Sequence, residues 1–157
     1  MKRRLLPVSI LIFILLANYS CDPNRVYDEY VAVNANGWDS RESVRLVAEL
    51  TDTVSLCSCY INVRNTTDYP FSNLYLFIKT IYPDGKVAMD TIQLQLADKS
   101  GKWLGKGIGK LRDNQVLLMK DIRFPYTGKY VFEISQAMRV NKLKGIKDIG
   151  MRISKQS

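Results

Sequence analysis

Most of the sequence alternates between apolar and polar positions with a period of two residues. Val44, Leu46 and Leu50 fall on one set of alternate positions, whereas Arg45 and Glu49 fall on the other. Because successive side chains of a strand point to opposite faces, this pattern predicts a half-buried β-strand. The same reasoning predicts about eight strands along the chain, at residues 25–33, 44–50, 54–64, 73–82, 92–96, 116–124, 129–134 and 146–153.

The connections between these segments carry the residues that turns require. Pro83-Asp84-Gly85-Lys86 predicts a hairpin over residues 73–96, because proline presets φ and glycine accepts a positive φ. Residues 73–82 are nearly all apolar or aromatic, which favours a strand covered on both faces. Gln136–Lys142 is the one segment that suggests a helical turn. The pattern therefore predicts a single all-β domain, an antiparallel β-sandwich that is jelly-roll-like.

The N-terminus has the three parts of a bacterial lipoprotein signal peptide. Lys2-Arg3-Arg4 is positively charged, residues 5–17 are apolar, and Ser20 directly precedes Cys21. The apolar run is too short to span a bilayer, which requires about 20 residues. We therefore expect residues 1–20 to be a signal peptide, and residues 21–157 to be one domain anchored to a membrane through lipids on Cys21. The alternative is an ordinary signal peptide with an incidental cysteine.

Charge and composition narrow the location and the partners. No acidic run follows Cys21, which favours a lipid-anchored position that faces the periplasm. The formal net charge is +8, and much of the excess lies between Arg139 and Lys155. This basic segment has no interleaved aromatic platform, so we interpret it as a solvated surface and expect no nucleic-acid binding.

The sequence contains no histidine, which excludes Ser-His and Cys-His nucleophile pairs and histidine-ligated metals. The glycine-rich segment 101–110 differs from a phosphate-binding P-loop in its spacing, and Gly107 follows Lys106 where that motif needs Ser or Thr. Its glycines therefore predict bends or close backbone approach. We expect no enzyme, no cofactor and no metal site.

Cys57 and Cys59 are separated by one residue within a predicted strand. That geometry is unfavourable for a disulfide, and the pair lacks the further ligands of a structural zinc site. We therefore expect two small, buried, free cysteines.

Nearly the whole chain after Cys21 resembles the family of the gliding-motility lipoprotein GldH. The similar blocks occur in the family's order, at Arg25–Tyr30, Ile61–Phe77, Pro83–Gly85, Asp90–Asp98, Gly101–Gly105, Phe124–Pro125, Gln136–Arg139 and Gly145–Gly150. The resemblance implies a component needed for gliding over surfaces in bacteria that also have a type IX protein-secretion machine. It carries over no catalytic residues.

Two functions follow as hypotheses. The first is a non-enzymatic accessory or structural component of the motility and secretion machinery, which binds other proteins of that machinery through Trp103, Lys102, Arg139 and Tyr69. The second is a glycan- or ligand-binding β-sandwich that uses exposed aromatic side chains. Tyr75 is expected in the core. For Trp103, a core position and an interface position both remain open, and the resemblance favours the interface.

Overall fold

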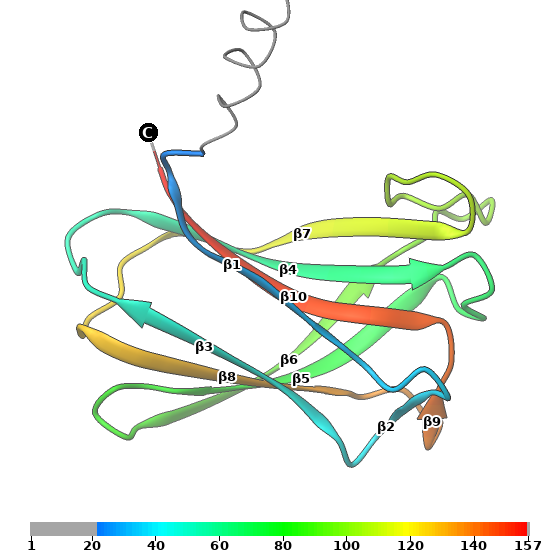
Figure 1. The fold of residues 1–157 in the computed structure, drawn as a ribbon, viewed down its shortest axis with the longest axis horizontal. Coiled ribbons are helices and arrows are strands. Elements are labelled where there is room, and N and C mark those ends of the chain that lie inside the picture. The colour runs from blue at the N-terminus through cyan, green and yellow to red at the C-terminus, as the bar shows by residue number, and fades with distance from the viewer. Residues whose placement is uncertain (1–21, 157) are drawn as a thin grey trace, which may run out of the picture.

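A computed structural model describes residues 22–156, so the expected signal peptide and the expected lipidation site, Cys21, lie outside the described residues (Figure 1). Every regular element of this part is a β-strand, and it contains no helix long and apolar enough to cross a membrane. The strands are β1 (Arg25–Ala32), β2 (Trp38–Asp39), β3 (Ser43–Leu50), β4 (Cys57–Thr66), β5 (Asn73–Ile81), β6 (Val87–Gln95), β7 (Leu111–Ile122), β8 (Gly128–Gln136), β9 (Lys142–Leu143) and β10 (Ile146–Lys155).

The eight long strands form two four-stranded antiparallel sheets. One sheet has the order β1-β10-β4-β7 and the other β3-β8-β5-β6, while β2 and β9 pair separately. The pairs β5–β6, β4–β7, β3–β8 and β1–β10 are nested within one another along the chain. This is the winding of a jelly roll, in which one long hairpin of strands is rolled into two sheets. The predicted sandwich and the predicted hairpin are both confirmed.

The apolar positions that alternate along the strands face the core, and the polar positions between them face the surface. In β3, Val44 and Leu46 are buried, and Leu46 lies opposite buried Phe132 of β8. The other sheet contributes residues such as Ile61 and Met151, both fully buried. Each such aliphatic side chain contributes about 1.5–3 kcal/mol of hydrophobic free energy on burial. The core is therefore one layer of side chains between the two sheets.

The prediction that residues 73–82 are covered on both faces is wrong. In β5, Leu74, Leu76 and Ile78 point into the core, whereas Tyr75 is 38% exposed and Phe77 is 47% exposed. The expected core position of Tyr75 is wrong for the same reason. No second layer within residues 22–156 covers the outer face of this sheet, so every alternate side chain of β5 faces solvent.

The helical turn expected over Gln136–Lys142 is also wrong. The Gln136 side chain donates from Nε2 to the Val140 carbonyl at 2.8 Å, and its Oε1 accepts from the Met138 amide at 2.9 Å. Through these two bonds the Gln136 side chain pairs with the backbone of the residues that follow it, which offers that backbone an alternative to a helical turn. The segment therefore forms a bend between β8 and β9.

Candidate functional site

The loop between β6 and β7 crosses from one sheet to the other beside the start of β7 (yellow-green in Figure 1). At its first end the Leu104 amide donates to the Leu96 carbonyl at 2.9 Å. Asp98 closes the turn between them, because its Oδ1 accepts from the Lys102 amide at 3.0 Å and from the Ser100 amide at 2.9 Å. The hydrogen bond from the Ser100 side chain is the main reason that the pKa of Asp98 lies below its usual value. The loop is therefore held in a defined shape.

The glycines of this loop allow close backbone approach, as the sequence predicted. A Cβ on Gly105 would lie 2.6 Å from Oδ1 of Asn114, and one on Gly107 would lie 2.1 Å from the Leu111 carbonyl oxygen. Asn114 is itself fixed, because its Nδ2 donates to the Val63 carbonyl at 3.1 Å and to another side-chain amide. The loop backbone therefore rests directly on β7, with no room for side chains between them.

Trp103 lies half-buried at the base of the loop and packs on the core. Its ring is 6.4 Å from the ring of Tyr69, and Tyr69 in turn packs edge-on against Phe71 at 5.7 Å. Tyr69 is buried, and its hydroxyl donates to the Asn73 carbonyl at 2.8 Å. Tyr69 therefore supports Trp103 from within the core, and of these two side chains Trp103 has the exposed part that a partner can contact.

The two basic residues of the predicted site lie on either side of this aromatic group. Lys102 is exposed in the turn that Asp98 closes. Arg139 is exposed beside Phe71 and Met138, where these residues line a surface pocket of about 500 Å³. Trp103 and Tyr69 are in contact, while Arg139 is connected to them through Phe71.

Two residues of the basic segment near the C-terminus are paired with acidic side chains of the domain. Arg152 bonds to Asp28 at 2.7 Å and also pairs with Asp22, and Lys155 bonds to Asp52 at 2.6 Å. The positive charges closest to the C-terminus are therefore compensated within the domain.

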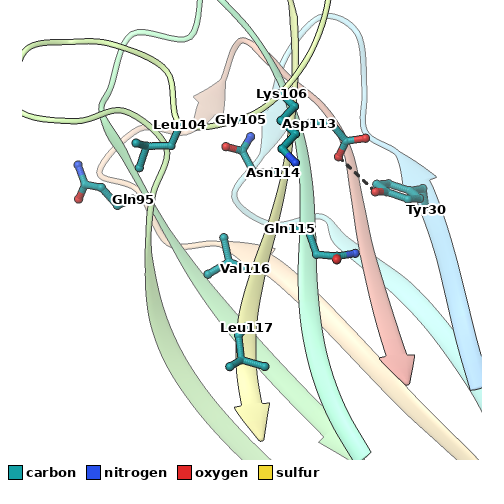
Figure 2. A pocket seen from close by; sticks show the side chains of 10 residues that line it. All are labelled: Tyr30, Gln95, Leu104, Gly105, Lys106, Asp113, Asn114, Gln115, Val116 and Leu117. Carbon is teal, nitrogen blue, oxygen red and sulfur yellow. Dashed lines mark hydrogen bonds between the residues drawn. The ribbon is translucent and has the colours of Figure 1, made fainter. Parts of the chain in front are cut away.

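A groove of about 740 Å³ runs between the loop and the outer edge of β7 (Figure 2). Its lining residues are Tyr30, Gln95, Leu104, Gly105, Lys106, Asp113, Asn114, Gln115, Val116 and Leu117. At one position the loop pairs with β7, where Lys106 and Asp113 exchange backbone hydrogen bonds at 3.0 and 2.7 Å. Beyond this rung the loop leaves the strand, and the groove follows the β7 edge past Gln115 and Leu117.

The polar end of the groove is an aromatic and ionic cluster. The Arg64 guanidinium lies 4.0 Å from the centroid of the Tyr30 ring, and its Nε donates to Asp113 at 3.3 Å. The Tyr30 hydroxyl donates to the same carboxylate at 3.3 Å, as Figure 2 shows. Burial, together with this carboxylate, raises the pKa of Tyr30 to about 12. Tyr30 is therefore a hydrogen-bond donor at neutral pH, and the cluster is a rigid wall.

Cys57 and Cys59 are free and buried, as predicted. Burial raises the pKa of both thiols, that of Cys59 to about 12. No group of three or more acidic or cysteine side chains that could hold a metal ion occurs among residues 22–156.

The aromatics considered for glycan binding do not form an exposed row. Tyr69, which packs against both Phe71 and Trp103, is buried, and Tyr75 on the outer face of β5 lines the same surface pocket as Phe71. The sequence reasoning identified Trp103 and the glycine-rich loop, but it missed the groove residues Gln115 and Leu117. Their polar and apolar alternation resembles that of any strand, so no local signal marks them.

The comparisons with known proteins agree with one another. A sequence model of the family described as GldH lipoprotein matches residues 25–153. The chain is 36% identical over 155 residues to "Gliding motility lipoprotein GldH homolog" of Christiangramia forsetii, with 94% of each chain covered. It is 31% identical over 154 residues to "Gliding motility lipoprotein GldH" of Flavobacterium johnsoniae, with 94% of this chain and 95% of the relative covered.

Among solved structures, the chain is similar to the VP2 subviral particle of infectious bursal disease virus, with 15% identity and a TM-score of 0.36. The match covers 82% of this chain and 30% of the viral one. The family match extends over most of the chain, and both relatives exceed 30% identity over nearly their full length. This protein belongs to the GldH lipoprotein family.

Proposed function

We propose that the protein is a non-enzymatic accessory or structural component of the gliding-motility and type IX secretion machinery. It is held on the outer membrane by lipids on Cys21, faces the periplasm, and binds other proteins of that machinery. The observation that carries the proposal is the similarity over nearly the full length to two relatives that are named as gliding motility lipoproteins.

The geometry supports binding to a protein. The groove beside β7 is an open channel along a strand edge, walled by Leu104 and Leu117 and closed at one end by the Tyr30 cluster. Half-buried Trp103 lies directly before Leu104 in the same loop. Large aromatic and aliphatic side chains at a concave surface are the usual anchors of protein–protein contacts.

The test is deletion of the gene in its own host, with complementation by the wild-type chain. Surface spreading and the amount of protein exported to the cell surface and medium are measured. We expect loss of spreading in a motile host and reduced export, with both restored by complementation. A deletion strain that spreads and exports like its parent would refute the proposed function.

A further inference from the structure

The two long sides of the sandwich differ. On one side β1 packs against β3, which closes the gap between the sheets. On the other side β6 and β7 are the outer strands, and they do not pack closely together. A cavity of about 200 Å³ between them, lined by Leu118 and Met119 of β7 and Ile92 of β6, reaches core residue Phe132. The jelly roll is therefore open along the β6–β7 side.

The backbone at this open side has unused hydrogen-bonding capacity. The Asp113 amide and carbonyl bond to Lys106, so they point away from β4. Because backbone groups alternate in direction along a strand, those of Gln115 and Leu117 point the same way. No strand within residues 22–156 pairs with that side of β7 beyond the Lys106 rung. Such an edge is a template for one more strand.

Exposed apolar side chains lie beside this edge. Leu104 on the loop wall is 55% exposed, and Leu117 and Met119 on β7 are 49% and 42% exposed. The usable edge is short, because the Lys106 rung ends it on one side and the register shift between Leu117 and Met119 interrupts the alternation on the other. Since the groove has two walls, a narrow extended segment fits it better than the broad edge of a second sandwich does.

We propose that this groove binds an extended segment of a partner protein, which adds to the sheet as a strand beside Gln115 and Leu117. Main-chain hydrogen bonds hold the segment on β7, and its apolar side chains pack against Leu104 and Leu117. The Lys106 rung shows that the β7 edge accepts such pairing. This proposal adds the class of partner, an extended protein segment, to the proposed function. It rests on the proposed function only for the statement that the partner belongs to the motility and secretion machinery.

A photo-crosslink in the native host tests the proposal with the full-length chain. Benzoylphenylalanine replaces Leu104 on the groove wall, or Val47 on the outer face of the other sheet as a control of similar exposure. Each of these two crosslinker variants is made with a second substitution at Leu117. Leu117→Pro removes the amide that points away from β4, so no hydrogen bond to β4 is lost. Leu117→Ala is its matched control, because alanine keeps that amide. We expect an adduct at position 104 that maps to one extended segment of another protein. The proline variant should lower its yield at least tenfold below that of the alanine variant, because both variants lose the Leu117 side chain and only the proline variant loses the amide.

Amide hydrogen exchange supplies a second measurement on the purified, unmutated chain. A synthetic peptide that copies the crosslinked segment should slow exchange at Gln115 and Leu117 at least tenfold, and leave Val116, whose amide faces β4, unchanged. This measurement decides the matter if Leu117→Pro fails to accumulate in the membrane. Equal adducts in the proline and alanine variants, an adduct with a second copy of this chain, no adduct, or unslowed exchange would each overturn the proposal. These readouts do not depend on spreading or export, so they fail separately from the proposed function.

Discussion

Lys106 and Asp113 exchange both of their backbone hydrogen bonds, and this single rung attaches the glycine-rich loop to the edge of β7. Gly105, directly before the rung, lies on the side-chain amide of Asn114. The shape of the groove therefore depends on the contact between the Gly105 backbone and the Asn114 side chain, which is possible because glycine has no side chain.

Gly105→Ala should destabilise the protein. The added Cβ would lie 2.6 Å from Oδ1 of Asn114, so the amide must move away from the Val63 carbonyl and leave a buried group without its partner. We expect a loss of about 1–3 kcal/mol in the free energy of unfolding, measured by thermal unfolding. Gly109→Asn is the control, because Gly109 has a φ of 64° and open space, and asparagine tolerates that conformation. Equal melting temperatures for the two variants would contradict this account.

Trp103→Ala should impair function more than folding. Trp103 is only half-buried, whereas Trp38 is fully buried and donates from Nε1 to the Glu42 carbonyl at 3.0 Å. Trp38→Ala should cost about 3–5 kcal/mol and remove folded protein from the membrane. Trp103→Ala should cost clearly less, leave folded protein in the membrane, and still abolish spreading or export. If both variants melt equally low, Trp103 serves only the core and its assignment to the partner site fails.

Cys57 and Cys59 should remain free and unreactive in the folded protein. Native protein treated with iodoacetamide at pH 7 should stay unmodified, while unfolded protein gains two labels by mass spectrometry. Burial raises the pKa of Cys59 to about 12, so the folded state keeps a proton that the unfolded state releases above about pH 8.5. The free energy of unfolding should therefore be insensitive to these thiols below that pH and decrease as the pH rises through it. A Cys59→Ala variant should lose this part of the decrease in the free energy of unfolding at alkaline pH.

In the labelling experiment, rapid modification of the folded chain by iodoacetamide would show that the strand opens.

Cys21→Ser should yield a full-length precursor that carries no acyl label. Lipoprotein signal peptidase cleaves its substrate only once the cysteine thiol carries a lipid. Serine has no thiol, so neither the lipidation nor the cleavage should occur. Metabolic labelling with a fatty acid and the apparent mass of the precursor provide the measurement. A serine variant that is labelled, or that is cleaved elsewhere at the normal rate, would refute the lipid anchor.

Much of the fold follows from local features of the sequence. The period of two predicts the long strands, and Gly85, with a φ of 84°, takes the turn position that the Pro-Asp-Gly motif requires. The strands β2 and β9 escaped prediction because each has two residues and exists only through pairing of Trp38 with Leu143, far apart in the chain. The helical turn at Gln136 was mispredicted because its side chain bonds the backbone locally.

The candidate site divides in the same way. The sequence by itself predicted bends or close backbone approach over residues 101–110, and it singled out Trp103 within them. Only the tertiary structure decided that Tyr69 is buried beneath Trp103, that Tyr75 faces solvent, and that the β7 edge at Gln115 and Leu117 is open. The physical reason is that hydrophobic periodicity is a local property. Whether a strand lies in the middle or at the edge of a sheet depends instead on pairing between distant segments, here the nested pairs of a jelly roll.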